Sequence, residues 1–191
     1  GKENQGLPNF NVALERDNMN VGNVLREAGY TTGFVGKFHL TSNLDFPEFY
    51  KGKDKWINIP KNARPGPETS AQFKHNERWM RRYLKELGFS WAKNVYPENT
   101  PSPYSTHNPE WTTVAALEFI EENKDGPFYL HLCSTLLHGP DRSWRKSMDQ
   151  PLITGEGEVK SLPEIMTPRA ELLKTISEKG FDPDSHVAGE A

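Results

Sequence analysis

The stretch that decides the fold is Gly29-Tyr30-Thr31-Thr32-Gly33-Phe34-Val35-Gly36-Lys37-Phe38-His39-Leu40. Residues 30–35 are rich in aromatic and β-branched side chains, which predicts a β-strand. Gly36 is expected to end that strand. Lys37 and His39 then begin the loop that follows it.

A helix is expected immediately before this strand. Four apolar side chains recur at the i, i+3, i+4 and i+7 spacing of one helix face, namely Val21, Val24, Leu25 and Ala28. Asn18 or Asn20 is a suitable N-cap, and Gly29 stands where a helix C-terminal glycine belongs. The order is therefore helix, glycine break, strand and polar loop.

A second unit repeats this plan further along the chain. Asn108-Pro109 is a plausible helix start, because proline is favoured at the first helical position. The expected apolar face of this helix is Val114, Ala116, Leu117 and Ile120. The run 128–134 then reads as a strand covered on both faces, and His138 lies in the loop after it.

Two helix–strand units predict an α/β fold with a parallel sheet. In open sheets of this kind, ligands bind outside the carboxyl ends of the strands. Lys37, His39 and His138 each come just after an expected strand. We therefore expect these three side chains to converge on one pocket.

The segment between the two units, about 43–107, is expected to be a loop-rich insertion with one helix over about 76–87. Its aromatic and proline-rich part, 91–104, is interpreted either as a wall of a substrate cleft or as a flap that only packs. A further helix is expected over about 167–180.

Composition narrows the possible functions. Of 191 residues, 35% are hydrophobic, and the formal net charge is -3. This charge argues against a nucleic-acid partner, which normally selects a basic stripe. No apolar run has the length of a bilayer span, so no membrane partner is expected. The single cysteine, Cys133, lies among apolar residues and is interpreted as a structural thiol.

A lysine and two histidines at one pocket would suit an oxyanion. Lysine supplies a compact positive charge, and histidine binds oxygen atoms or transfers a proton near neutral pH. The pattern Lys-x-His is a weak signal by itself, because most such pairs on loops have no catalytic role.

Residues 29–40 resemble the second signature of the sulfatase family, with Gly-Tyr, a Thr one residue later, then Gly-Lys, an aromatic residue and His. Residues 21–28 resemble the helix that leads into that signature, and 116–130 resemble the helix and strand that run on to a loop histidine, here His138. The resemblance implies part of an alkaline-phosphatase-like fold, a mostly parallel sheet with helices on both faces.

The resemblance also implies a chemistry. In the family the nucleophile is a formylglycine made from Cys or Ser, and a divalent metal, usually calcium, binds the sulfate oxygens. Carried over, Lys37 would contact sulfate and the formylglycine, and His39 would bond to the formylglycine hydrate. His138 would bind a sulfate oxygen and protonate the leaving alkoxide.

Two elements of the family pattern are missing from the sequence. No Cys/Ser-x-Pro/Ala-Ser-Arg motif precedes Lys37, and neither the acidic metal ligands nor the later Asp-Asn pair is found. We therefore expect residues 1–191 to be the central portion of a sulfatase catalytic domain. The formylglycine and the calcium ligands are expected outside this chain, which should be inactive by itself.

Several points stay open at the level of sequence. The implied substrate is a sulfated small molecule or carbohydrate, and the parent protein is expected to be periplasmic, secreted or lysosomal, as sulfatases mostly are. The alternatives are a phosphodiesterase or phosphonate hydrolase of the same superfamily, or a non-catalytic anion-binding module. The oligomeric state is undetermined.

Overall fold

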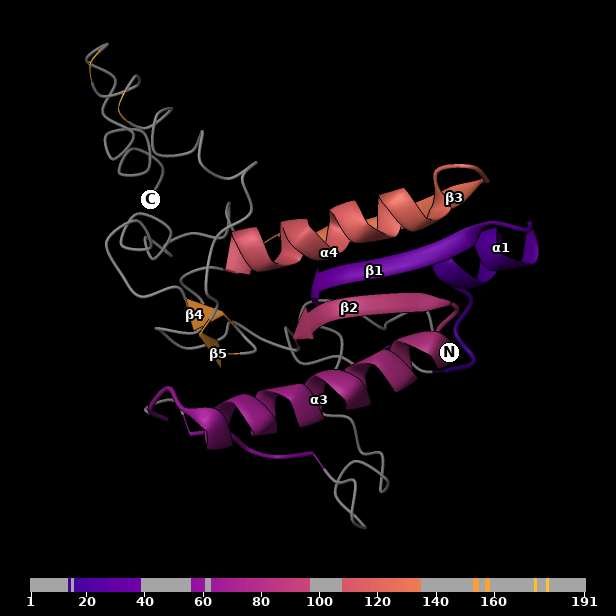
Figure 1. Cartoon of the computed structure of the whole chain (residues 1–191). Coiled ribbons are helices and arrows are strands. Elements are labelled where there is room, and N and C mark those ends of the chain that lie inside the picture. The colour runs from indigo at the N-terminus through magenta and orange to yellow at the C-terminus, as the bar shows by residue number, and fades with distance from the viewer. Residues whose placement is uncertain are drawn as a thin grey trace, which may run out of the picture.

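The structure is a computed structural model that describes residues 14, 16–38, 56–60, 63–96, 108–134, 153–154, 157–158, 174 and 178. Its centre is a three-stranded parallel sheet in the order β2-β1-β3, formed by β1 (Thr31–Lys37), β2 (Trp91–Tyr96) and β3 (Phe128–Cys133). Helices α3 (Pro67–Glu86) and α4 (Asn108–Asn123) lie on opposite sides of this sheet (Figure 1). The expected α/β fold with helices on both faces is therefore confirmed.

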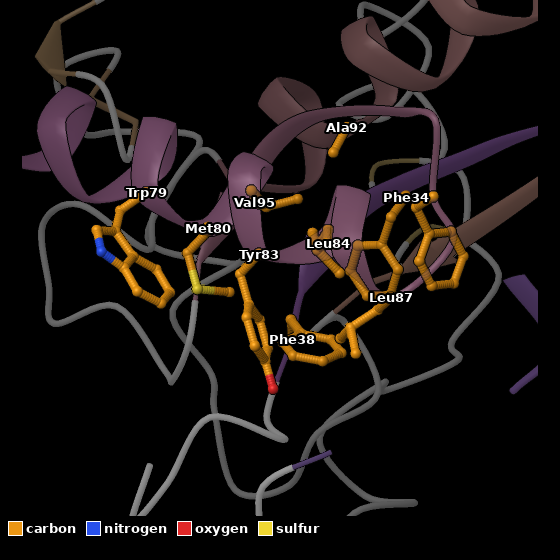
Figure 2. Close-up of a cluster of buried hydrophobic side chains, with 10 residues drawn as sticks. Phe34, Phe38, Trp79, Met80, Tyr83, Leu84, Leu87, Ala92 and Val95 are labelled. Atoms are coloured by element: carbon orange, nitrogen blue, oxygen red, sulfur yellow. The ribbon is translucent and has the colours of Figure 1, made fainter. Parts of the chain in front are cut away.

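The main core lies between α3 and the sheet. Phe34 of β1 and Phe38 make an edge-to-face contact with ring centroids 5.4 Å apart, and Phe38 in turn contacts Tyr83 of α3. Figure 2 shows this apolar cluster, whose buried members are Phe34, Phe38, Trp79, Met80, Tyr83, Leu84, Leu87, Phe89, Ala92 and Val95. Burial of this apolar surface is the main force that holds α3 on the sheet.

Helix α4 covers the other face of the sheet, and Phe119 is the side chain at the centre of this contact. The ring of Phe119 is fully buried and contacts Trp91 of β2 and Phe128 of β3, with centroids 5.1 and 5.7 Å away. Between these two strands it lies against Gly33 of β1. Helix α4 therefore lies over the central strand.

Helix α1 (Val21–Glu27) packs near the amino ends of the strands. The side chain of Asn20 caps it by accepting from the backbone N–H of Gly22, at 2.8 Å, so one of the two expected caps is confirmed. Gly29 has φ +87°, which agrees with its expected role after the helix C-terminus.

The side chains expected to face inward from α1 and α4 were predicted wrongly. In α1 the buried residue is Gly22, which packs against the 87–89 turn, and Val21 and Val24 are exposed. In α4 the buried side chains include Trp111, Ala115, Ala116 and Phe119, whereas Val114, Leu117 and Ile120 are exposed. Of the residues expected to face inward from α4, only Ala116 does so.

The loop-rich interpretation of 43–107 is also wrong where this segment is described. Helix α3 is 20 residues long and begins at Pro67, well before the expected start near residue 76. Trp91–Tyr96 is strand β2, paired in parallel with β1, rather than the beginning of a long loop. Thus the plan of helix, glycine and strand occurs three times, with Gly88 as the break before β2.

Two minor elements complete the described residues. Strands β4 (Ile153–Thr154) and β5 (Gly157–Glu158) form a small antiparallel pair. Of the helix expected over 167–180, Lys174 and Glu178 are described, and both are helical. In the part of the chain that the structure describes, no helix has the length and apolar character to cross a membrane.

Candidate functional site

Lys37 is the last residue of the central strand. It is half-buried, and its register partner on β2 is Tyr96, the last residue of that strand. On the other side, Gly36 is paired with Cys133, the last residue of β3. All three strands therefore end at one edge, and Lys37 stands at its middle, where parallel sheets commonly bind ligands.

The chain immediately after Lys37 is anchored firmly. The backbone N–H of Phe38 donates to the carbonyl oxygen of Tyr96 at 2.8 Å, which extends the contact between the two strands beyond Lys37. The ring of Phe38 is only 5% exposed, because it lies within the core beneath α3. Phe38 therefore has a fixed position at the end of β1.

Gly36 allows β1 and β3 to approach each other closely next to Lys37. Its φ is +96°, a backbone conformation that residues with a Cβ rarely adopt. A Cβ at Gly36 would lie 2.1 Å from the carbonyl oxygen of Cys133. The glycine before Lys37, first interpreted as the end of the strand, instead lies inside it, and β1 continues to Lys37.

A β-bulge on β2 lies beside the carboxyl end of β1, between the partners of Val35 and Gly36. The register moves from Val35↔Lys93 to Gly36↔Val95, which leaves Asn94 as the extra residue, with φ +54°. The backbone N–H of Asn94 donates to Glu77 Oε1 of α3 at 3.0 Å, and its side-chain Nδ2 donates to the carbonyl oxygen of Trp111 at 2.6 Å. Asn94 thereby ties both covering helices to the strand end.

The first turn of α4 also lies at this edge. Trp111 stacks on Tyr96, with centroids 6.1 Å apart and an interplanar angle of 27°. Glu110, also in the first turn, is buried, and a carboxylate at this position stabilises the positive end of the helix dipole. The edge thus combines Lys37 with a helix N-terminus that has its own acidic side chain.

Of the three predicted site residues, the structure describes Lys37, which is the last residue of β1 rather than the first residue of the loop. His39 and His138 lie outside the described residues, so their convergence with Lys37 stays a prediction. The neighbouring ends of β1 and β3 do bring the starts of their two loops close together. The sequence analysis did not identify Tyr96 or the bulge at Asn94, because both lie on strand β2, which was not predicted. The signal for that strand was a third glycine, Gly88, between a helix and a short apolar segment.

A row of titratable side chains on β3 belongs to the core rather than to the site. His131 stacks on Phe34 with centroids 5.1 Å apart, and its Nδ1 lies 2.8 Å from the hydroxyl of Tyr129. Burial lowers the pKa of His131 and raises the pKa of the Cys133 thiol. Cys133 is consequently protonated at neutral pH, which agrees with a structural thiol rather than a nucleophile.

Within the described ranges, no three side chains of His, Cys, Asp or Glu gather in a way that could hold a metal ion. None of the described residues is therefore assigned to the divalent metal that the resemblance implies.

Comparison with known families decides the identity. A family model described as Sulfatase matches residues 3–152, which include every element from α1 to β3. The chain belongs to the sulfatase family. No curated protein matches the chain. The matched span includes Lys37, His39 and His138.

Proposed function

We propose that this sulfatase chain supplies the sulfate-binding side chains Lys37, His39 and His138 of a sulfuric ester hydrolase. The observation that carries the proposal is the position of Lys37, at the carboxyl end of the central strand in a chain that matches the sulfatase family. A half-buried cation at this edge suits an anionic substrate.

The three side chains would share the work of the reaction. Sulfuryl transfer places negative charge on the non-bridging oxygens and on the leaving oxygen, and fixed donors aimed at that charge lower the barrier. The Lys37 ammonium would hold a non-bridging oxygen. His138 would donate to the sulfate and protonate the leaving alkoxide, and His39 would orient the nucleophile and help to expel sulfate afterwards.

The nucleophile and the metal would come from polypeptide beyond these residues. The motif Cys/Ser-x-Pro/Ala-Ser-Arg, from which formylglycine is made, does not occur in the sequence. A divalent cation such as calcium would supply further charge neutralisation at the sulfate. The proposed substrates are sulfated small molecules or carbohydrates, and the proposed compartment is the periplasm, the lysosome or the exterior of the cell.

Steady-state kinetics test this proposal. The reading frame that contains these residues is expressed from its natural start to its natural stop, and hydrolysis of an aryl sulfate is measured with calcium present. Lys37→Met, His39→Ala and His138→Ala should each lower kcat/KM by roughly 100-fold or more, the usual effect of losing an oxyanion donor or a general acid. Lys85→Met, an exposed lysine at the end of α3, is the control and should leave kcat/KM unchanged.

Three outcomes would contradict the proposal. Wild-type activity in Lys37→Met would remove the assigned role of that side chain. Hydrolysis of phosphodiesters or phosphonates in preference to sulfate esters would favour the related hydrolases instead. Turnover of the aryl sulfate by residues 1–191 alone would show that the nucleophile is not supplied from elsewhere.

A further inference from the structure

The side of α3 that faces away from the sheet carries a row of cationic side chains. Met80, Tyr83 and Leu84 of this helix are buried against the sheet. Successive residues of a helix are about 100° apart, so the opposite side of α3 is formed by residues at other positions of the turn. Four exposed cations lie there, namely Lys74, Arg78, Arg81 and Arg82, and are called the α3 basic face below.

Repulsion within the α3 basic face works against the helix. Lys74 and Arg78 are four residues apart, as are Arg78 and Arg82, and like charges at this spacing destabilise a helix. Among the residues that the structure describes, no carboxylate forms an ion pair with Lys74 or Arg78. A row of charges that breaks this rule without compensation from the fold indicates a partner outside it.

One carboxylate lies beside the α3 basic face, but it is bound to the sheet. Glu77 is 7% exposed, and its Oε1 accepts from the backbone N–H of Asn94 at 3.0 Å. Its Oε2 lies 3.9 Å from Nη1 of Arg81, too far for a hydrogen bond. The Arg81 side chain is still 49% exposed, and a guanidinium has several N–H donors. Arg81 therefore keeps donors for a ligand.

The α3 basic face leads toward the edge of the sheet at which Lys37 lies. Helix α3 runs beside β2 in the opposite direction, because only a short turn at Gly88 joins the helix to the strand (Figure 1). The bond between Asn94 and Glu77 places Glu77 near the carboxyl end of β2. Lys74 comes three residues before Glu77, so Lys74 is the member of the face nearest to this edge.

The length and composition of the α3 basic face suit a polyanion. From Lys74 to Arg82 the helix rises by about 12 Å, at about 1.5 Å per residue. One small anion can contact only a part of this length, whereas a polymer with repeated anionic groups can contact all of it. The face is mostly arginine, whose planar guanidinium binds oxyanions through paired N–H bonds.

We propose that the α3 basic face binds a polysaccharide that carries several sulfate groups, and that it directs this chain toward Lys37. This inference rests on the proposed function, which makes sulfate esters the substrates. Charge complementarity identifies the partner, because each sulfate group is a fixed oxyanion. Binding along α3 would raise the local concentration of sulfate esters at the edge where Lys37 lies.

An anionic membrane suits this surface less well. A helix that binds in the membrane interface buries an apolar face among the lipids. The apolar face of α3, which includes Met80 and Leu84, is already buried in the protein core (Figure 2). A nucleic acid also carries repeated oxyanions, and the experiment below distinguishes it from a sulfated polysaccharide.

Affinity for heparin, a highly sulfated polysaccharide, tests the proposal in the complete reading frame. The double variant Lys74→Gln/Arg78→Gln should raise Kd by about 30-fold, if each cation contributes as it does at other anionic surfaces. The slope of log Kd against log salt should also fall by about two, because each cation displaces about one counterion. Glutamine is a good helix former, so the helix should be retained.

The matched control removes the same charge elsewhere. Lys124→Gln/Lys174→Gln changes two exposed lysines outside α3 and should leave both Kd and its salt dependence unchanged. Arg78→Gln alone gives a second test, with an expected rise in Kd of about 5-fold. Thermal unfolding checks the fold, because loss of repulsion between like charges should not lower Tm.

Two results would overturn the proposal. One is equal heparin affinity in Lys74→Gln/Arg78→Gln and in its control. The other is tighter binding of single-stranded DNA, or of vesicles that contain phosphatidylserine, than of heparin at the same salt concentration. That second result would assign the α3 basic face to a nucleic acid or to a membrane.

Failure of this inference and failure of the proposed function are distinguishable. Sulfate-ester hydrolysis that depends on Lys37, together with unchanged heparin affinity in Lys74→Gln/Arg78→Gln, would retain the function and remove the polysaccharide site. Heparin affinity that depends on Lys74 and Arg78, without hydrolysis of any sulfate ester, would retain the site and remove the function.

Discussion

The ring of Phe119 occupies the space that a side chain at Gly33 would need. A Cβ at Gly33 would lie 2.6 Å from Cε2 of Phe119, closer than any real contact of this kind. Because this ring joins α4 to all three strands, it has little room to move aside. Glycine in the middle of the central strand is thus a packing requirement.

Gly33→Ala should therefore destabilise the fold by about 1–3 kcal/mol, the usual cost of overpacking a core. The measurement is thermal unfolding followed by circular dichroism. The smaller Leu at position 119 should partly relieve the clash, so the double variant Gly33→Ala/Phe119→Leu should cost less than the two single variants together. Additive costs would show that the two residues do not compete for space.

Gly36→Ala should be more damaging than Gly33→Ala. The new Cβ would meet a backbone carbonyl oxygen of β3, which has less freedom than a side chain, and the φ of +96° is strained for alanine. We expect a loss above about 3 kcal/mol or failure to fold. Gly126→Ala is the matched control, because nothing lies within 4 Å of a Cβ there, and its stability should be unchanged. Equal Tm values for the two variants would contradict the close approach of β1 and β3.

Substitutions at Asn94 should separate its two roles in the bulge. Asn94→Gly keeps the left-handed backbone but loses the side-chain bond to Trp111, whereas Asn94→Ala also acquires strain at φ +54°. Each should be destabilising, with Asn94→Ala the worse by about 1 kcal/mol. Chemical denaturation of both variants measures the difference. A more stable Asn94→Ala would show that the backbone at the bulge is not left-handed.

His131 should make the fold less stable in mild acid. Burial lowers the pKa of His131 in the folded state, so the unfolded chain takes up the proton first as the pH falls. The contribution of His131 to the free energy of unfolding is present above pH 6.5, about the ordinary pKa of histidine. It is lost progressively as the pH falls below that value. His131→Phe should flatten the fall in Tm between pH 8 and pH 5. His75→Gln removes a histidine from α3 as a control, and an equal flattening there would contradict the assignment to His131.

Local signals predicted several elements correctly. The strand before Lys37, the cap at Asn20 and the helix start at Asn108 each depend on a few neighbouring residues, so a short window of sequence contains the information. The parallel direction of the strands followed from the repeated helix–strand plan.

Two features were misjudged for identifiable reasons. Helix α4 carries apolar residues around most of its circumference, so periodicity does not indicate which of them face the sheet. Strand β2 opens the aromatic and proline-rich segment 91–104, and that composition favoured a loop. The strand also contains Lys93 and Asn94. Both polar side chains have partners that are distant in sequence, Glu118 for the first and Trp111 for the second.

The sequence by itself determined the fold class, the family and the buried strand that leads to Lys37, because these depend on local propensity and on the order of motifs along the chain. Only the tertiary structure decided which strand lies beside β1, which faces of α1 and α4 are buried, and that Gly33 and Gly36 are required by contacts. These contacts join residues far apart in the chain. Their free energy depends on packing in three dimensions, which no local pattern of residues specifies.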